Sequence, residues 1–281
     1  MNDSTLRAVR FIGADGAAHL GALTADSVRD AGPAPPAGFI PSPQGWEAIA
    51  AAAGEEHALA DLELLHPVQA GKILAIAVNY RAHAEESELD VPAVPVMFAK
   101  FPSSLIGHGA AIVVPREETR PDFEGEVAVV IGRRTYRADV NQALEAVGGI
   151  SVLNDVSGRR AQLETPLRQF TLGKSFDTFT PMGPGIAHPA GLDLANLALE
   201  TTVSGELMQQ GNTRDLIHSI ASLIVYLSAG TTLEPGDVIA TGTPSGVGDS
   251  RTPPRYLREG DVVEVSVEGV GTLRNTVALE R

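Results

Sequence analysis

Three carboxylates lie in or directly after two apolar stretches of the chain. Glu124 and Glu126 are two residues apart in the segment 122–131, whose β-branched and apolar residues are typical of a strand. Because alternate side chains of a strand point to the same face, these glutamates would project side by side. Asp155 ends a second apolar run, residues 151–155, and could close the same site. Three oxygen ligands favour Mg²⁺, Mn²⁺ or Ca²⁺ over zinc. The alternative is that Glu-x-Glu marks the solvent face of an amphipathic strand.

Four further polar clusters follow predicted strands, at residues 79–86, 154–162, 173–177 and 241–248. Loops after strands are common places for function, because a rigid scaffold holds them. Each cluster also has an ordinary explanation by itself. His83 could be a surface histidine, Lys174 a solvated loop lysine, and Arg159 the partner in a surface salt bridge.

The elements that must hold these clusters are mainly short strands. Apolar runs between turn residues predict strands at residues 6–13, 18–23, 72–78, 94–100, 111–114, 237–241, 261–267 and 272–279. Residues 197–205 and 206–209 predict a hairpin around Ser204-Gly205. The prolines between residues 33 and 43 should interrupt regular structure.

Helical patterns cover residues 46–53, 139–147 and 213–229. The last of these has the clearest helical period. Asn212 with Asp215 resembles an N-terminal cap for it, and Gly230 a C-terminal stop. Strands and helices do not alternate as β–α–β, and the chain has no GxGxxG or Walker loop. The sequence therefore predicts the α+β fold class.

The composition of the 281 residues narrows the classes of function. The formal net charge of −14, without a basic stripe, argues against a nucleic-acid partner. The absence of cysteine excludes disulfides, a thiol nucleophile and Cys-ligated zinc. We see no signal peptide and no apolar run long enough to span a membrane. These features predict a soluble, cytoplasmic protein with no membrane partner.

Taken in order, the polar clusters resemble the fumarylacetoacetate hydrolase family. The resemblance runs from about residue 70 to the C-terminus, and its markers are Asn79-Tyr-x-x-His83-x-x-Glu86, Phe123-Glu-x-Glu126, Asn154-Asp-x-Ser-x-Arg159, Gly173-Lys-Ser-Phe-Asp177, Leu233-Glu-Pro-Gly-Asp-Val-Ile239 and Thr241-Gly-Thr-Pro-x-Gly246. It implies a homodimer built on a mixed β-roll core rich in short strands. With the break near His66-Pro67, we expect a small N-terminal domain at residues 1–67 and the catalytic domain at residues 68–281.

The same resemblance implies one divalent metal per subunit, Mg²⁺ or Mn²⁺ with Ca²⁺ as a further option. Glu124, Glu126 and Asp155 would be its protein ligands, and an α-keto acid would fill the open coordination positions. Three carboxylates around a dication leave a net negative charge, so nearby cations should balance it. Arg159 and Lys174 match family positions that have this role.

The family's catalytic pair falls on His83 and Glu86, which would be neighbours on one helical turn. The carboxylate would fix the tautomer of the imidazole, whose other nitrogen would deprotonate water. Glu85 is a competing candidate for the partner of His83. The segment 84–95, rich in acids and prolines, would be a lid over bound substrate.

Further residues are expected to bind or stabilise the substrate. Lys174 would help to hold the negative charge of the departing enolate, and Gln162 would face the substrate or its attacking water. Arg81 and Thr243 complete the expected substrate-binding set. Arg160, where the family often has Asp, could indicate a second substrate carboxylate or could be a surface arginine.

The predicted function is that of a metal-dependent hydrolase, which cleaves the C–C bond of an acylpyruvate or a related β-diketo acid. The alternative keeps the same metal site but isomerises or decarboxylates muconate-type diacids, or decarboxylates oxaloacetate. A second alternative is a non-catalytic metal- or ligand-binding protein, for which a general base would have no use.

Overall fold

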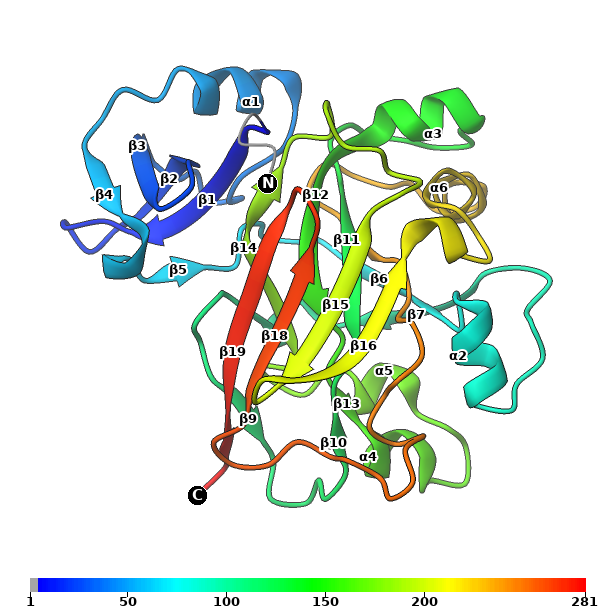
Figure 1. The fold of residues 1–281 in the computed structure, drawn as a ribbon. Coiled ribbons are helices and arrows are strands. Elements are labelled where there is room, and N and C mark those ends of the chain that lie inside the picture. Colours follow the sequence, from blue (N-terminus) through cyan, green and yellow to red (C-terminus); the bar gives the residue numbers. More distant parts are fainter. Residues whose placement is uncertain (1–4) are drawn as a thin grey trace.

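The computed structural model describes residues 5–281 and has two main sheets (Figure 1). Along the path of the larger one lie β4 (Glu56–Ala58), β3 (Ser27–Pro33), β2 (Ala18–Leu23), β1 (Arg7–Ile12), β14 (Thr180–Ala187), β12 (Val147–Asn154), β11 (Gly125–Ile131), β17 (Val238–Ala240), β6 (Ile73–Ala77) and β7 (Val96–Lys100). Off this path, β5 (Leu64–Leu65) pairs with β1 and β8 (Leu105–Ile106) with β14. This mixture of many strands and few helices confirms the predicted α+β class.

The smaller sheet packs against the middle strands of the larger one. Its order is β16 (Glu206–Asn212), β15 (Ala198–Val203), β18 (Val262–Val267), β19 (Gly271–Leu279) and β9 (Ile112–Val114). The predicted hairpin is confirmed, because β15 and β16 pair around Ser204 and Gly205, both of which have positive φ. A third, two-stranded sheet joins β10 (Pro121–Asp122) to β13 (Ser157–Gly158).

The strand β11 lies at the centre of the packing. All of its residues are buried, as are those of β12 and β14. Alternate side chains of β11 enter two different apolar clusters. Val127 and Val129 belong to the first cluster, and Ala128 and Val130 belong to the second. The first cluster also contains residues of the smaller sheet, such as Leu199. A strand covered on both faces explains why this segment is an almost continuous apolar run.

The N-terminal strands extend the large sheet. Arg7 of β1 pairs with Ala187 of β14, so the first residues described are hydrogen-bonded to the central strands. The proline-rich stretch lies between β3 and the helix α1 (Pro43–Ala50). This helix begins three residues before the predicted position, because Pro43 takes its first position and the Ser42 hydroxyl caps it. The proposed boundary at residue 67 stays a prediction.

The other helices lie outside the sheets: α2 (Arg81–Glu86), α3 (Val140–Ala146), α4 (Arg159–Leu163), α5 (Phe170–Gly173) and α6 (Ile220–Ser228), with 3₁₀ turns η1 (Leu59–Asp61), η2 (Pro102–Ser104) and η3 (Thr213–Asp215). Figure 1 shows α3 at one end of the molecule and α4 and α5 at the opposite end, with α2 to one side. Within residues 5–281, no helix is both long enough and apolar enough to cross a membrane.

The helix predicted for residues 213–229 is too long by seven residues at its start. Its N-cap is Ser219, whose hydroxyl accepts from the Ser222 amide, whereas Asn212 caps only the short turn η3. Residues 216–218 do not continue the helix, because their backbone bonds to the chain around Asn79: Leu216 bridges to Tyr80, and the Ile217 amide donates to the Asn79 carbonyl oxygen. These tertiary bonds override the helical period of the sequence.

Candidate active site

Strand pairing brings the three predicted metal ligands together. Gly125 of β11 lies opposite Asn154 of β12, so Glu124 and Glu126 come to the same sheet end as Asp155. One carboxylate oxygen from each of the three lies within 4.8 Å of the others, and all three residues are buried. The glycine between the glutamates is required by packing, since a Cβ at Gly125 would lie 2.1 Å from the Thr201 hydroxyl.

Three buried cations surround two of these carboxylates. The Lys174 ammonium donates to Glu124 Oε2 at 2.6 Å and to Asp155 Oδ2 at 2.7 Å. Arg159 donates to Glu124 Oε1 at 2.6 Å, and Lys100 to Asp155 Oδ1 at 2.5 Å. Burial by itself would raise the pKa of Glu124, but the positive charges, chiefly that of Lys174, lower this pKa to about 2. The side chain is therefore ionised at neutral pH.

Glu126 is the exception in this cluster. Its carboxylate accepts a hydrogen bond from the Gly242 amide at 2.8 Å, and within residues 5–281 it forms no ion pair. Burial raises the pKa of Glu126 well above its usual value, and the neighbouring Asp155 and Glu124 raise it further. A divalent cation would supply the missing positive charge, and three carboxylates suit Mg²⁺ or Mn²⁺. The residues present thus fit a divalent metal.

The residues expected to form the catalytic pair lie on α2. His83 Nδ1 is 3.5 Å from Glu86 Oε2, whereas Glu85 is exposed. The carboxylate of Glu86 is itself fixed, because the Gly246 amide donates to both of its oxygens, at 2.9 and 3.0 Å. The structure therefore pairs His83 with Glu86 and leaves the Nε2 atom of the imidazole for another partner.

A network of amide side chains holds the loops around this pair. Asn79 donates to the carbonyl oxygen of Thr241 at 2.7 Å and accepts from the His218 amide at 2.8 Å, which fixes the chain just before α2. Gln209 donates to the Thr243 hydroxyl at 2.7 Å and accepts from the Gly125 amide at 3.0 Å. The loop at residues 241–246 is thus bonded both to β11 and to the segment that leads into α2.

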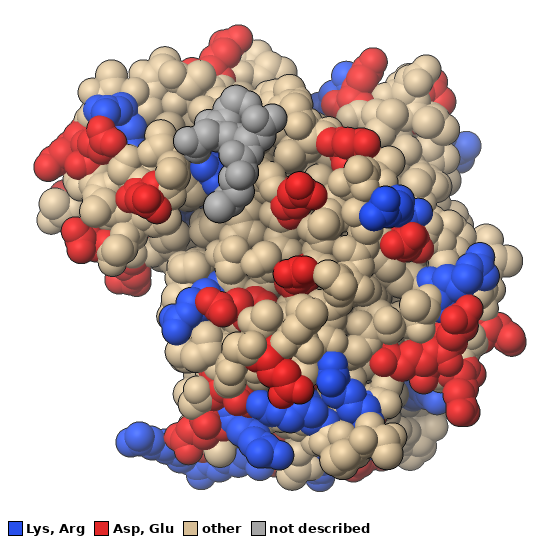
Figure 2. Space-filling model, viewed as in Figure 1, with Lys and Arg blue, Asp and Glu red and all other residues tan. Residues whose placement is uncertain are grey.

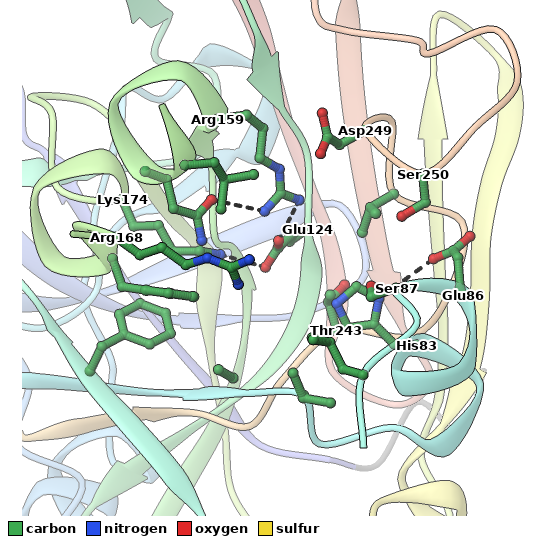
Figure 3. A pocket seen from close by; sticks show the side chains of 18 of the residues that line it. His83, Glu86, Ser87, Glu124, Arg159, Arg168, Lys174, Thr243, Asp249 and Ser250 are labelled. Atoms are coloured by element: carbon green, nitrogen blue, oxygen red, sulfur yellow. Dashed lines mark hydrogen bonds and ion pairs between the residues drawn. The ribbon is translucent and has the colours of Figure 1, made fainter. Parts of the chain in front are cut away.

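A cavity of about 350 Å³ brings most of the predicted site residues together. Figure 3 shows Lys174, Arg159, Arg168 and Glu124 on one side of it, and His83, Glu86, Ser87 and Thr243 on the other. Gln162 also lines it, as do Glu88 and Leu89 of the segment expected to be a lid. Glu126 and Asp155 are not part of the lining. The Lys174 ammonium, which lines the cavity, lies between Glu124 and Asp155 and donates to both.

Two arginines named from the sequence lie elsewhere. Arg81 is exposed in the first turn of α2 and does not line the cavity. Arg160 is exposed on α4, where its guanidinium donates to the Glu117 carbonyl oxygen at 2.6 Å. The surface alternative for Arg160 therefore fits its position.

Sequence reasoning missed three side chains of the site. Lys100 is the only charged residue of β7, and a lysine that ends an apolar strand is the signal that could have identified it. Asp122 receives two bonds from Arg159, at 2.9 and 2.8 Å, and accepts from the Gly248 amide at 2.7 Å. Arg168 lines the cavity from the loop between α4 and α5, and nothing in its sequence context distinguishes it from a surface arginine.

The chain is similar to proteins whose names describe three different reactions. The family model of the fumarylacetoacetate (FAA) hydrolase C-terminal domain matches residues 72–278. The oxaloacetate tautomerase YisK of Bacillus subtilis is 43% identical over 227 residues, 79% of this chain and 75% of that protein. The 2,4-didehydro-3-deoxy-L-rhamnonate hydrolase of Sphingomonas sp. is 42% identical over 242 residues, 83% of this chain and 84% of that protein. The crystal structure of 5-carboxymethyl-2-hydroxymuconate delta-isomerase from Mycobacterium smegmatis superposes with a TM-score of 0.81 and 35% identity, over 98% of this chain and 99% of that one.

Proposed function

Since the chain belongs to the fumarylacetoacetate hydrolase family, we propose that it is a divalent-metal-dependent enzyme that interconverts the keto and enol forms of a 2-keto acid of the oxaloacetate type. The observation that carries this proposal is the His83–Glu86 pair, which lines one cavity together with Glu124 of the carboxylate cluster and with the cations Lys174 and Arg159. A base opposite a cationic centre is what proton removal next to a keto group requires.

The metal would be held by Glu124, Glu126 and Asp155, and its Lewis acidity would polarise the keto group of the substrate. Glu86 would keep the proton of His83 on Nδ1, so that Nε2 can accept a proton from the carbon beside that keto group. Returning the proton to the oxygen gives the enol, and the reverse transfer gives the keto form. The reaction consumes no water and no co-reactant.

Two cations would assist this transfer. Lys174 and Arg159 line the cavity beside Glu124 and would offset the negative charge that develops on the substrate oxygen. Both are nearly inaccessible to solvent, so their charges act in a region of low dielectric constant and are only weakly screened.

Hydrolysis of an acylpyruvate is the second candidate, and Gln162 favours it. The Gln162 carbonyl oxygen accepts from Arg159 at 3.0 Å, but within residues 5–281 its amide NH₂ makes no hydrogen bond. This group lines the cavity and could hold a water molecule for deprotonation by His83. The name of the Sphingomonas relative agrees with a hydrolytic outcome on the same site.

The test follows the fate of the substrate by NMR in D₂O with added Mg²⁺ or Mn²⁺. Tautomerisation incorporates deuterium beside the keto group of oxaloacetate, decarboxylation releases pyruvate, and hydrolysis splits an acylpyruvate into two acids. His83→Ala should lower kcat for deuterium incorporation by roughly 10²–10⁴-fold and leave Mn²⁺ binding unchanged. Glu86→Gln should lower it in the same direction, whereas its exposed neighbour gives the matched control Glu85→Gln, which should not.

Two results would refute the proposal. If deuterium enters oxaloacetate equally fast with His83→Ala, this side chain is not the base. If the wild-type rate is unchanged by a chelator, the carboxylate cluster is not the centre of the reaction. Cleavage of acylpyruvates without exchange in oxaloacetate would select the hydrolytic candidate instead.

A further inference from the structure

Arg168 has no role in the proposed reaction, yet its side chain enters the same cavity. It lies in the loop between Leu163, the last residue of α4, and Phe170, the first residue of α5. Figure 3 shows its guanidinium beside Lys174, directed into the cavity. The position places a positive charge close to the substrate without placing it among the metal ligands.

The other cations on this side of the cavity are already engaged. Arg159 donates to Asp122, Glu124 and Gln162. Lys174 donates to Glu124 and Asp155. By contrast, Arg168 makes no hydrogen bond and no ion pair within residues 5–281, although a guanidinium carries five N–H donors. Its donors are therefore available to a ligand.

Within residues 5–281, none of the four acids that line this cavity bonds Arg168: Glu124 is paired with Lys174 and Arg159, and Glu88 is exposed. Glu86 is bonded to the Gly246 amide, and Asp249 is bonded to Arg120 and Tyr256. The rings of Phe98 and Phe170, whose centroids are 5.7 Å apart, line the cavity next to Arg168. Apolar rings reduce the contact of a charge with water, and this strengthens its attraction for an anion.

Arg168 also marks a boundary between two cavities. A second cavity of about 540 Å³ shares Arg168, Phe98 and Phe170 with the first, and the rest of its lining is mostly apolar, including Val96, Met97 and Leu172. A substrate chain that extends away from the metal ligands toward this side would meet either the guanidinium or the apolar wall. Arg168 is therefore placed to discriminate between substrates with a second carboxylate and substrates with an apolar acyl chain.

We infer that Arg168 binds the second carboxylate of the substrate, so that the enzyme selects 2-keto dicarboxylates over 2-keto monocarboxylates. This inference rests on the proposed function and assigns its substrate class. The planar fork of a guanidinium matches a carboxylate with two parallel hydrogen bonds, which neither Lys nor Gln can reproduce. In a chain with a net charge of −14, a free cation at the site also counteracts the repulsion of a dianion.

The experiment compares two substrates that differ only in this carboxylate. Oxaloacetate and 2-oxobutanoate have the same carbon chain, with a methyl group of the second in place of the distal carboxylate of the first. Deuterium incorporation beside the keto group is measured for both with the Mg²⁺-loaded protein. Arg168→Gln should lower kcat/KM for oxaloacetate by roughly 10- to 100-fold, mainly through KM, and change that for 2-oxobutanoate little. Arg168→Lys should recover only part of the loss.

The matched control is Arg160→Gln, because Arg160 is exposed on α4 outside the cavity and should change neither rate. An equal loss for both substrates, or no loss for oxaloacetate, would overturn the inference. If the wild type exchanges neither substrate, the proposed function fails, and calorimetric binding of oxaloacetate to the Mg²⁺-loaded wild type and Arg168→Gln still decides the role of Arg168. Equal affinity of the two proteins would then refute it.

Discussion

At the scale of single residues, the three acidic residues expected to bind the metal differ in how the protein balances their charges. Glu124 and Asp155 are each bonded to two buried cations, but among the described residues the partner of Glu126 is the Gly242 amide alone. Removing the charge of a paired carboxylate leaves buried cations without a partner, which is strongly unfavourable. Removing the charge of Glu126 removes an expected metal ligand and, within residues 5–281, no ion pair. Substitutions of these residues should therefore all weaken metal binding but differ in their effect on folding stability.

We expect Glu126→Gln to weaken Mn²⁺ binding by roughly 10- to 100-fold or more. Mutation of residues that only support the ligands already lowers metal affinity by this factor, and loss of a ligand should cost no less. In the presence of a chelator, its free energy of unfolding in urea should equal that of the wild type or exceed it. Glu124→Gln should weaken binding as well, and it should also lose about 3–5 kcal/mol of stability, because Lys174 and Arg159 lose a buried partner. Calorimetric titration and urea unfolding measure the two effects. Unchanged Mn²⁺ affinity in either variant would refute the ligand assignment.

The sequence could predict these carboxylates but not their cationic surroundings. Glu124 and Glu126 follow from strand alternation, a rule that links neighbours in sequence. Lys100 lies 55 residues before Asp155, and Asp122 lies 37 residues before Arg159. No local pattern connects residues so far apart, and only the folded sheet shows that Lys100 at the end of β7 reaches the cluster. The free guanidinium of Arg168 is likewise visible only once its neighbours are placed.

At the scale of elements, the loop at residues 241–249 positions α2 against the metal-ligand strand. The Gly242 amide bonds Glu126 and the Gly246 amide bonds Glu86, so one loop touches both halves of the site. Gly246 has a φ of +102°, and a Cβ there would lie 2.1 Å from the Met208 carbonyl oxygen. Only glycine can satisfy both the backbone angle and the packing.

We expect Gly246→Ala to lower kcat by up to about 100-fold, because the loop must shift and Glu86 then no longer orients His83. Mn²⁺ affinity should stay within a few-fold of the wild type, since the three expected ligands lie in or directly next to the paired strands β11 and β12. The control is Gly205→Ala, which also has positive φ but has open space around its missing Cβ. It should cost some stability and leave kcat unchanged. Wild-type kcat in Gly246→Ala would show that the loop does not orient the pair.

Local patterns predicted elements where neighbouring residues decide the structure. The strands at the two ends of the chain and the hairpin around Ser204 are confirmed. The predicted start of α6 was wrong. Leu216 forms a bridge with Tyr80, 136 residues earlier, and this pairing keeps Leu216 out of the helix. The small helices α4 and α5 were not predicted, since five and four residues are too few to show a helical period.

At the scale of the whole molecule, charged and exposed apolar side chains are unevenly distributed over the surface. On the face shown in Figure 2, acidic side chains are spread widely, while Lys and Arg side chains gather at the end that carries β10 and α4. The edge strand β7 exposes Val96 and Met97 to 50% and 46%, and Phe101 follows at 48%. An exposed apolar edge strand is unfavourable in water unless another surface covers it.

The homodimer implied by the family resemblance therefore remains a prediction, and we propose β7 as part of its interface. Met97→Asp should reduce the mass measured by light scattering after gel filtration from twice 29.3 kDa to that of one chain, because a charge buried between two copies has no partner. Leu144→Asp is the matched control, since Leu144 is 47% exposed on α3, at the end of the molecule opposite α4 and α5, whereas β7 contacts α5. It should leave the mass unchanged. Met97 also lines the second cavity with Phe98 and Arg168, so the monomeric variant should lose selectivity between oxaloacetate and 2-oxobutanoate. A monomeric wild type would refute the predicted homodimer, whereas a Met97→Asp variant that stays dimeric would move the interface away from β7.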